Sequence, residues 1–323
     1  MRCLITGVAG FIGSHLAERL LAAGHEVCGI DNFADDYTRD LKERNLTIAR
    51  SWQRFTLVEK DLLVHDLTPW LDGVDWVFHL AALAGVRASW GADFARYVNN
   101  NVLATQRLLE TLARLRCARR FVYASSSSVY GEAGHALLAE HLRPQPHSPY
   151  GMTKLAAEHL CMLYRRNFGL PTVALRYFTV YGPRQRPEMA LQRFCQAALD
   201  HEPLHIFGNG TQSRDFTFVE DIVEANLLAA TTEAALGTTL NIGSGVQTTL
   251  REVFALLEEI SETQLTIQYG PRQFGDVTET LADISRARQV LGYAPQTSLR
   301  AGLARQFAEL VDIHVRAGGS LVA

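Results

Sequence analysis

Short apolar runs alternate with amphipathic helical patterns through the first half of this sequence. An alternation of strands and helices predicts a parallel sheet whose faces are covered by helices. We therefore expect an α/β fold with a doubly wound parallel sheet. The apolar runs are 3–5, 26–30, 76–80, 120–125 and 171–176, and the helical patterns are 13–23, 101–115 and 150–168.

The regular alternation ends after Tyr181, where several glycines and prolines interrupt the pattern. A helical pattern followed by a strand pattern returns from Val219 onward, so the chain is expected to pass between two lobes more than once. We predict a sheet domain and a smaller lobe of mixed α/β structure. The predicted sheet domain is 1–178 and 216–262, and the predicted smaller lobe is 179–215 and 263–323.

Composition narrows the classes of protein that the chain could be. It has 323 residues and a formal net charge of −3, which argues against an electrostatic interface with nucleic acid. Its five cysteines are widely spaced and form no C-x-x-C pair, so neither a metal site nor a disulfide framework is expected. No apolar run reaches the roughly 18 residues of a membrane span, and no leader pattern precedes the first strand. We expect a cytoplasmic protein that does not insert into a membrane.

A glycine pattern joins the first predicted strand to the first helix. Gly7, Gly10 and Gly13 form G-x-x-G-x-x-G, and glycines allow a tight turn and close approach of the backbone to a ligand. The N–H groups at the start of the helix would then face a pyrophosphate. Asp31 ends the next strand, where a carboxylate accepts the ribose hydroxyls of NAD and repels the 2′-phosphate of NADP. The glycines alone are also typical of a plain strand–helix turn, but together with Asp31 they predict an NAD site.

Hydroxyl groups follow the fourth predicted strand, at the edge where open α/β sheets bind ligands. Ser126 lies in this serine run, and Tyr150 and Lys154 lie one turn apart on one face of the next helix. A phenol has a pKa of about 10, so it is a base at neutral pH only if positive charge stabilises the phenolate. Lys154 and the positively charged nicotinamide of NAD are the candidates for that charge. His79, by contrast, is interpreted as a core histidine.

The motifs, taken in order, resemble the extended short-chain dehydrogenase/reductase family, and within it the nucleotide-sugar epimerases, dehydratases and decarboxylases. The resemblance covers nearly the whole chain. It implies a Rossmann sheet with a smaller lobe that binds the nucleotide sugar. The matching segments are 7–13, 125–131, 150–154, 176–186, 214–216 and 275–277.

This resemblance implies roles for the hydroxyl residues and contacts to NAD. Tyr150 would remove a proton from a sugar hydroxyl, Lys154 would lower the pKa of the phenol, and Ser126 would hydrogen-bond the same hydroxyl. Hydride would pass from carbon 4 of the sugar to NAD. The residues implied to contact NAD are Gly7, Gly10, Phe11, Ile12, Gly13, Asp31, Asn32, Asp61, Leu62, Leu80, Ala81, Ala82, Tyr150 and Lys154.

Two departures from the family's patterns bear on the reaction. Family dehydratases carry Asp and Glu at the two positions after the hydroxyl residue, whereas Ser127 and Ser128 stand here. Elimination of water needs an acid and a base, so a 4,6-dehydratase is disfavoured. A family decarboxylase pattern has Glu at the position of Ser128, which disfavours decarboxylation as the normal outcome. Of the three reaction classes that the resemblance implies, epimerisation is the one that these two departures do not disfavour.

The substrate end resembles the family's grip on a nucleotide diphosphate. Guanidinium groups suit phosphate oxygens. The family often has an arginine at the position of Gln273, and Arg272 beside it is the candidate replacement. The residues predicted to contact substrate at this end and around the serine run are Arg87, Ser127, Asn209, Gln212, Arg214, Arg272 and Asp276.

A further segment resembles the UDP-glucuronate 4-epimerases of this family. The usual hexose epimerase run Arg-Tyr-Phe-Asn ends here in Thr179, and Arg186 precedes Pro-Glu-Met. In those enzymes the corresponding threonine and arginine hold the sugar carboxylate. The resemblance therefore implies that the chain converts UDP-glucuronate to UDP-galacturonate through a 4-keto sugar with bound NAD.

Two other functions remain open from the sequence. One is a 4-epimerase of a neutral UDP- or dTDP-hexose, and the other is a non-catalytic NAD-sensing interaction protein. The sequence does not decide between uridine and thymidine, and it gives neither the pathway nor the direction of flux. The family resemblance also implies a homodimer, in which the predicted helices 101–115 and 150–168 pair across a two-fold axis into a four-helix bundle.

Overall fold

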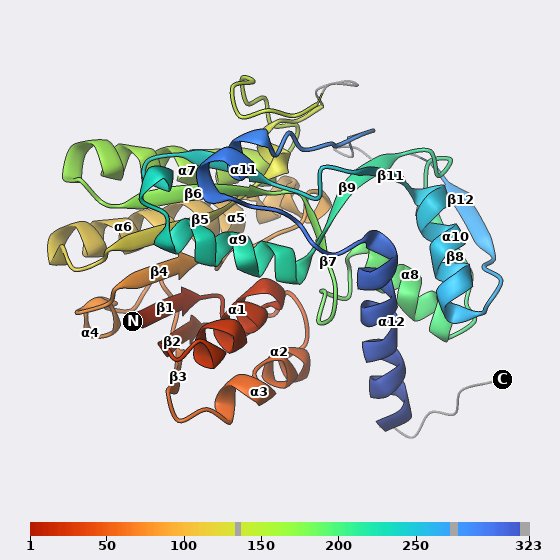
Figure 1. Cartoon of the computed structure of the whole chain (residues 1–323), viewed down its shortest axis with the longest axis horizontal. Helices are drawn as coiled ribbons and strands as arrows, with labels where there is room; N and C mark the ends of the chain where they lie inside the picture. The colour runs from red at the N-terminus through yellow and green to blue at the C-terminus, as the bar shows by residue number, and fades with distance from the viewer. Residues whose placement is uncertain (133–136, 272–276, 317–323) are drawn as a thin grey trace.

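The computed structural model describes residues 1–132, 137–271 and 277–316 of the chain. A large sheet with helices on both faces lies beside a smaller lobe. Figure 1 shows the sheet domain on the left and the smaller lobe, with β8, β12, α8 and α10, on the right. The predicted α/β fold with a doubly wound parallel sheet is confirmed.

All seven strands of the main sheet are parallel, and their order is β10-β6-β5-β4-β1-β2-β3. The chain runs outward from β1 to β3 and then returns to β4 on the other side of β1. The connections from β1 and β4 therefore diverge at a switch point, where sheets of this kind form a ligand crevice. The strands are β1 (Arg2–Thr6), β2 (Glu26–Asp31), β3 (Phe55–Glu59), β4 (Trp76–His79), β5 (Arg120–Ser126), β6 (Thr172–Tyr177) and β10 (Thr239–Ile242).

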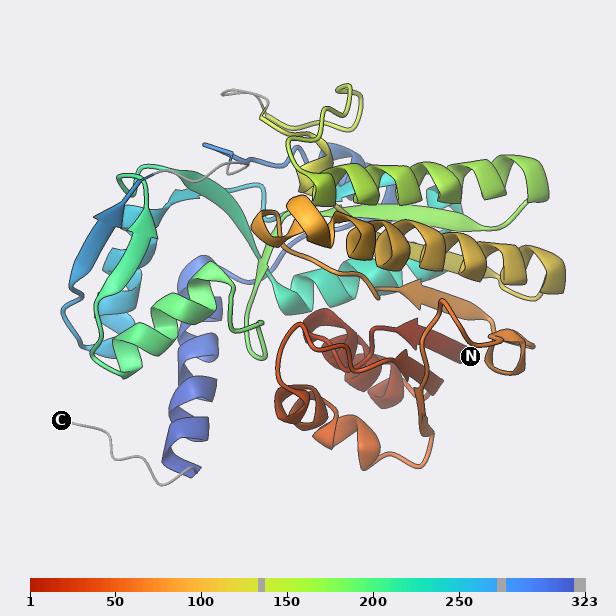
Figure 2. The ribbon, with the colours of Figure 1, turned by 180° about the vertical axis from the view of Figure 1, so that it is seen from behind.

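The sheet has two apolar cores because neighbouring residues of a strand face opposite sides. Ile5 of β1 lies in a cluster with residues of α1 and α9. Leu4 lies in the other cluster with residues of α6 and α7, two helices that run side by side in Figure 1 and in Figure 2, the view from behind. The helices are α1 (Phe11–Ala22) and α9 (Val219–Thr231) on one face, and α6 (Ala104–Leu115) and α7 (Pro149–Phe168) on the other.

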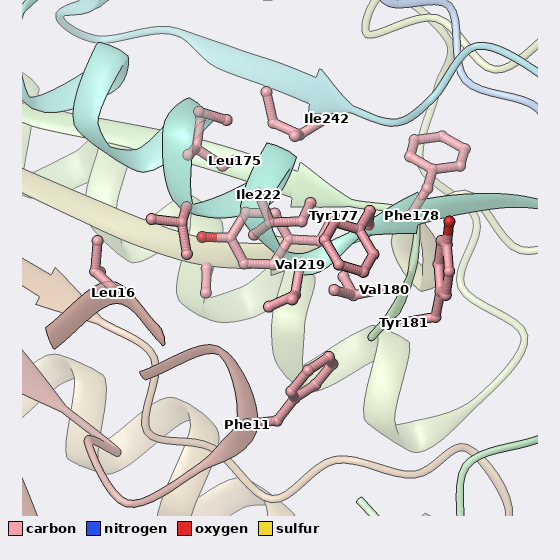
Figure 3. Close-up of a cluster of buried hydrophobic side chains, with 14 of the residues drawn as sticks. Phe11, Leu16, Leu175, Tyr177, Phe178, Val180, Tyr181, Val219, Ile222 and Ile242 are labelled. Atoms are coloured by element: carbon pink, nitrogen blue, oxygen red, sulfur yellow. The ribbon is translucent and has the colours of Figure 1, made fainter. Parts of the chain in front are cut away.

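The first core continues into the start of the smaller lobe. Figure 3 shows Phe11 of α1 and Ile222 of α9 in one buried cluster with Val180 and Tyr181 of β7 (Thr179–Tyr181). The rings of Tyr181 and Phe218 pack edge to face, with centroids 5.5 Å apart. This continuous packing fixes the strand that begins with Thr179 relative to the helix that follows the glycine turn.

In the part of the chain that the structure describes, the smaller lobe consists of two short sheets and three helices. One sheet has the strand order β11-β9-β7 and the other pairs β12 with β8. Helix α12 contacts α8 and α10, and Figure 1 shows it on the side of the lobe that faces the sheet domain. Besides β7, the smaller lobe contains β8 (Leu204–Phe207), β9 (Ser213–Phe218), β11 (Gln247–Thr249), β12 (Ile267–Gly270), α8 (Ala190–Leu199), α10 (Leu250–Ser261) and α12 (Leu299–Arg316).

The structure departs from the predicted division of the chain at β11 and the end of β9, which were expected in the sheet domain, and at two helices. Helix α10 was expected in the sheet domain, but it contacts α8 and α12 of the smaller lobe. Helix α11 (Ser285–Leu291) was expected in the smaller lobe, but it contacts β10 and α9 of the sheet domain. The apolar face of an isolated helix pattern does not say which core it covers, so the sequence could not assign either helix.

The predicted strands of the sheet are confirmed except that β3 was not anticipated. It lies at the edge of the sheet with only Val58 buried, so it lacks the continuous apolar run of the inner strands. A π-helical turn, Val98–Leu103, forms the start of the predicted helix 101–115. Short helices complete the sheet domain: α2 (Arg39–Asn45), α3 (Thr47–Arg50), α4 (Thr68–Leu71) and α5 (Phe94–Tyr97). In the described ranges, the helices lack the length and apolar character that crossing a membrane requires.

Candidate active site

A cavity of about 490 Å³ lies at the carboxyl ends of the strands of the main sheet. It brings together the glycine turn, the serine run, the start of α7 and the segment after β7. The predicted site residues that line it are Gly7, Gly10, Phe11, Ile12, Gly13, Asp31, Asn32, Asp61, Leu62, Leu80, Ala81, Ala82, Ser126, Ser127, Tyr150, Lys154, Thr179, Arg186 and Arg214. One continuous cavity thus joins the predicted cofactor end to the predicted sugar end.

Three predicted substrate residues do not line this cavity, and two lie outside the described residues. The Arg87 guanidinium lies over the ring of Phe207, 4.4 Å from its centroid. Asn209 accepts hydrogen bonds from the backbone and hydroxyl of Thr211 at 3.1 and 2.6 Å, and the Gln212 amide donates to the Phe207 carbonyl. The two residues outside the described ranges are Arg272 and Asp276, together with the neighbouring Gln273. Substrate contact by any of these residues stays a prediction.

The glycine turn has the shape that the predicted pyrophosphate site requires. Gly7 has a φ of 72°, and a Cβ atom there would lie 2.8 Å from the backbone nitrogen of Ala81 on the loop after β4. A Cβ atom at Gly13 would lie 2.2 Å from the carbonyl oxygen of Gly7. Gly10 occupies the N-cap of α1 and has no side chain to cover the first N–H groups of the helix. The residues present therefore fit a dinucleotide, because its phosphates need bare N–H groups at a helix start.

Asp31 lies at the end of β2, where the adenosine ribose of NAD was predicted to bind. Its carboxylate accepts hydrogen bonds from the backbone nitrogens of Ala9 and Phe33, both at 2.9 Å. Burial raises the pKa of this carboxyl, and the two backbone hydrogen bonds act against that rise. Beside it the Asn32 amide donates to Asp61 at 3.0 Å. The turn and the two acidic residues are thus held in one arrangement at the cofactor end.

The catalytic candidates come from the end of β5 and the start of α7. The Ser148 hydroxyl caps α7 by accepting from the Gly151 nitrogen at 3.1 Å. A Cβ atom at Gly151 would lie 2.4 Å from the carbonyl oxygen of Ser128, so glycine lets the start of α7 approach the serine run. This close contact brings the start of α7, with Tyr150, to Ser126, whose side chain acts to lower the pKa of the phenol.

Two basic side chains, Lys154 and Arg186, line the cavity together with Tyr150. Burial raises the pKa of the Tyr150 phenol, while the hydrogen bond with Ser126 and the positive charge of Arg186 act to lower it. Lys154 donates to the Ala124 carbonyl at 2.7 Å, and burial lowers the pKa of its ammonium to about 8. The positive charge of Arg186 therefore acts to lower the pKa of the phenol, and the lowering by Lys154 together with bound NAD stays a prediction.

A buried ion pair lies close to the catalytic candidates. Arg176 of β6 donates to both carboxylate oxygens of Glu158 on α7, at 3.0 and 2.6 Å. The Ser125 hydroxyl of β5 donates to the same carboxylate at 2.6 Å. Because all three side chains are buried and Glu158 bonds both of the others, they tie β5, β6 and α7 together, one residue from Ser126 and one helical turn from Lys154.

His79 occupies the core, as predicted. Its two ring nitrogens lie 2.7 Å from the hydroxyl of Thr6 and 2.8 Å from that of Thr105. Burial lowers the pKa of this imidazole to about 3. The ring is therefore neutral and fully engaged between β1, β4 and α6, and it does not line the cavity.

Strand β7 and the loop after it carry the two predicted carboxylate contacts in the cavity lining. Thr179 begins β7, and Arg186 follows a loop that leads toward α8. The Arg186 guanidinium pairs with Glu188 at 2.9 Å and is 17% exposed. Arg214 also lines the cavity, and its guanidinium donates to the carbonyls of Val277 at 2.7 Å and Thr278 at 3.1 Å.

The sequence reasoning missed two side chains that the structure places at the site. The Tyr37 hydroxyl is buried in the cavity lining without a hydrogen-bond partner among the described residues. Asn101 holds the loop after β4, because its amide bonds both backbone groups of Leu83, at 2.8 and 2.9 Å, and the Thr153 hydroxyl at 3.0 Å. The run of three asparagines at 99–101 was a usable signal for Asn101. No periodic pattern distinguishes Tyr37. Within the described ranges, no three His, Cys, Asp or Glu side chains are grouped to hold a metal ion.

Comparison with known proteins adds to this geometry. Residues 4–306 match the family model described as GDP-mannose 4,6 dehydratase. The chain is similar to an uncharacterized UDP-glucose epimerase, YtcB, of Bacillus subtilis, with 45% identity over 97% of this chain and 99% of that protein. It is 35% identical to the UDP-glucuronate 4-epimerase of Thermodesulfobacterium geofontis over 94% of each.

A solved structure is similar throughout. The crystal structure of UDP-glucuronic acid 4-epimerase from Bacillus cereus in complex with UDP-glucuronic acid and NAD superposes with a TM-score of 0.94 at 43% identity. The match covers 97% of this chain and 100% of that one. The similarity therefore includes both the sheet domain and the smaller lobe.

Proposed function

We propose a substrate for this chain, which belongs to the nucleotide-sugar epimerases of the extended short-chain dehydrogenase/reductase family and is an NAD-dependent nucleotide-sugar 4-epimerase. The substrate is UDP-glucuronate, which the enzyme converts to UDP-galacturonate at carbon 4. The observation that carries this proposal is the position of Arg186. Its guanidinium lines the same cavity as Tyr150 and is close enough for its charge to lower the pKa of the phenol.

A uronate differs from a neutral hexose by one carboxylate on carbon 5, next to the reacting carbon 4. A guanidinium and a hydroxyl are suitable partners for that group, because charge-assisted hydrogen bonds to a carboxylate are stronger than neutral ones. Arg186 and Thr179 provide this pair in the cavity wall. The similarity to two UDP-glucuronate 4-epimerases supports the same choice.

The chain's own residues would act in a defined order. The Tyr150 oxygen takes the proton from the hydroxyl on carbon 4, while Ser126 hydrogen-bonds that hydroxyl. When bound, NAD accepts the hydride of carbon 4 and later returns it. Thr179 and Arg186 hold the carboxylate while the 4-keto sugar turns to present its opposite face. Tyr150 then gives the proton back, so the reaction is redox-neutral overall.

The carboxylate contacts have a second task. Oxidation at carbon 4 of a glucuronate produces a β-keto acid, which loses carbon dioxide when the bond to its carboxylate aligns with the ketone. Holding the carboxylate in an orientation outside that alignment protects the 4-keto intermediate from decarboxylation. Ser127 and Ser128 line the cavity at the positions where family dehydratases carry an acid and a base. The matched family model is named for a dehydratase, but elimination of water is not expected of this chain.

A neutral UDP-hexose is the second candidate substrate. The similarity to the UDP-glucose epimerase YtcB favours it, whereas Arg186 would face no anionic group on such a sugar. A non-catalytic NAD-sensing role does not require Ser126, Tyr150 and Lys154 to meet in one cavity, and the family membership argues against it.

A substrate panel tests the proposal. Purified enzyme is incubated with UDP-glucuronate, UDP-galacturonate, UDP-glucose, UDP-galactose and dTDP-glucose, and the products are separated. We expect interconversion of the two uronates with the highest kcat/KM, without added NAD, and release of NAD from the denatured enzyme. A clear preference for a neutral sugar would contradict the proposal, and so would strict dependence on added reductant with net reduction of the product.

We also propose that the enzyme is a homodimer formed through α6 and α7. Three large apolar side chains at these helices are exposed: Leu103 by 45%, Met152 by 40% and Leu163 by 50%. A two-fold axis along this face would bury them in a four-helix bundle. Light scattering at micromolar concentration should give the mass of a dimer, and a monomer would contradict this proposal.

A further inference from the structure

A polar cluster connects α1, the helix that follows the glycine turn, to the loop that carries Arg186. We name it the Arg184 cluster; its members are His15, Glu18, Asn45 and Arg184. The Arg184 guanidinium donates to both carboxylate oxygens of Glu18, at 2.6 and 2.9 Å, and to the Asn45 carbonyl at 3.1 Å. It also lies 3.0 Å from Nδ1 of His15.

The cluster is mostly shielded from solvent, so its contacts are worth more than those of a surface ion pair. The side chains of Arg184 and Glu18 are 13% and 19% exposed. Burial and the charge of Arg184 lower the pKa of His15 to about 3, so the ring is neutral. A neutral imidazole has one acceptor and one donor: Nδ1 accepts from Arg184, and Nε2 donates to the Pro183 carbonyl at 2.9 Å.

One stripe of α1 serves both the cofactor cavity and this cluster. Phe11, His15 and Glu18 are spaced i, i+4 and i+7, so they share a face of the helix. Phe11 lines the cavity. Asn45 makes a second link, because its amide donates to the Ala9 carbonyl of the glycine turn at 2.9 Å while its own carbonyl accepts from Arg184.

The loop is also held from the other side, by α12 of the smaller lobe. The backbone nitrogen of Arg184 donates to Glu309 at 2.6 Å, and that of Gly182 donates to Gln306 at 3.0 Å. Arg184 itself has a φ of 63°, a left-handed conformation that costs a side-chain-bearing residue free energy. A costly conformation held from two sides by buried contacts indicates that the path of this loop is specified.

We propose that Arg184 is a positioning residue for uronate selectivity. It fixes the loop 182–186 against α1, so that Arg186, two residues later, faces the sugar carboxylate beside Tyr150. This inference rests on the proposed function. Arg184 is not among the residues that line the cavity, so it acts through Arg186.

The test uses three variants of the full-length enzyme. Arg184→Gly removes the guanidinium and also the conformational cost of the left-handed φ, which separates the side-chain contacts from backbone strain. Glu18→Gln keeps the shape of the partner but removes its charge. Arg19→Gln is the matched control on the same helix, because Arg19 is half exposed and lies 3.9 Å from an equally exposed Glu224.

We expect Arg184→Gly and Glu18→Gln each to lower kcat/KM for UDP-glucuronate by about tenfold, mainly through KM. The fraction of product lost as carbon dioxide should rise, while NAD content and turnover of a neutral UDP-hexose change much less. The double variant should be no worse than the worse single variant, because both remove one contact. Arg19→Gln should match the wild type.

Wild-type preference is measured first, so that the two proposals fail separately. A wild type that does not prefer UDP-glucuronate overturns the proposed function, and the positioning role falls with it. A wild type that prefers the uronate, with variants that keep that preference and release no extra carbon dioxide, overturns the role of Arg184 alone. Equal losses for both sugars, together with a lowered Tm, would also overturn it, because they indicate a merely structural role. If Arg184→Gly does not fold, Glu18→Gln decides.

Discussion

The two halves of the cavity are built differently. In the sheet half, the ends of strands and starts of helices place the functional groups, and backbone contacts hold them, as when Lys154 donates to the Ala124 carbonyl. In the lobe half, long guanidinium side chains reach into the cavity: Arg186 comes from the loop before α8 and is held by Glu188, and Arg214 comes from β9 and is held by backbone carbonyls. The difference suggests a division of labour, in which the sheet half determines whether chemistry occurs and the lobe half determines on which sugar.

The largest effect should come from the sheet half. Tyr150→Phe keeps the ring packing but removes the oxygen that carries the proton, so we expect turnover of every nucleotide sugar to fall by about 10²- to 10⁴-fold. NAD should remain bound, as measured by its release on denaturation. Ser126→Ala should be less severe. Near-normal turnover by Tyr150→Phe would show that another group is the base.

Two glycine substitutions compare the glycine turn of the sheet half with β12 of the smaller lobe. A Cβ atom at Gly13 would lie 2.2 Å from the Gly7 carbonyl oxygen, whereas one at Gly270 in β12 would meet its nearest atom at 3.5 Å. Gly13→Ala should therefore shift the turn at a cost of about 1–3 kcal/mol and lower NAD content of the purified enzyme. Gly270→Ala should retain NAD. Equal NAD content in both variants would contradict the role assigned to the turn.

A change in the lobe half should alter selectivity rather than chemistry. Arg186→Ala removes the cation for the sugar carboxylate, and one charge-assisted contact is worth about 1.5–3 kcal/mol, or roughly tenfold or more in partitioning. We expect a loss of preference for UDP-glucuronate over UDP-glucose and a larger fraction of 4-keto-pentose. Product analysis with detection of carbon dioxide measures both. Unchanged preference would place the carboxylate contact elsewhere and favour the neutral-hexose alternative.

The smallest effect concerns pH. Burial lowers the pKa of Lys154 to about 8 from 10.5, so its ammonium loses its proton as the pH rises through about 8. If that charge assists the phenolate, kcat should fall by a few-fold there, as a pH–rate profile would show. Lys154→Arg, if active, should move the fall to higher pH. A flat profile to pH 10 would show that the charge of Lys154 is not needed.

Unfolding would not explain such a fall in activity. Between pH 8 and 10.5 the unfolded chain binds a proton at Lys154 that the folded chain has lost, so this group's contribution to the free energy of unfolding rises with pH. The contribution is complete above the unfolded pKa and is lost as the pH falls through the folded value. Thermal unfolding measured over the same range separates the two effects.

The sequence predicted the sheet half more completely than the lobe half, for a physical reason. Tyr150 and Lys154 lie at fixed positions of a helix whose start is marked by Ser148 and Pro149, so their relation follows from helical geometry. The path of the loop that carries Asn209 depends on long-range contacts that no local pattern records. The effect of Arg186 on the pKa of Tyr150 was not predicted for the same reason, because the folded loop brings Arg186 to the phenol.

The placement of α10 and α11 has a consequence for how the molecule comes apart. Because the chain passes between the sheet domain and the smaller lobe several times, neither of these two halves of the molecule is a continuous stretch of sequence. No single backbone cleavage can therefore release one from the other. The contacts that complete each half join residues far apart in the chain, so closing them costs loop entropy before it gains packing. We expect the two halves to unfold together, and a gene fragment ending at residue 178 to lack β10, the strand that completes the sheet beside β6.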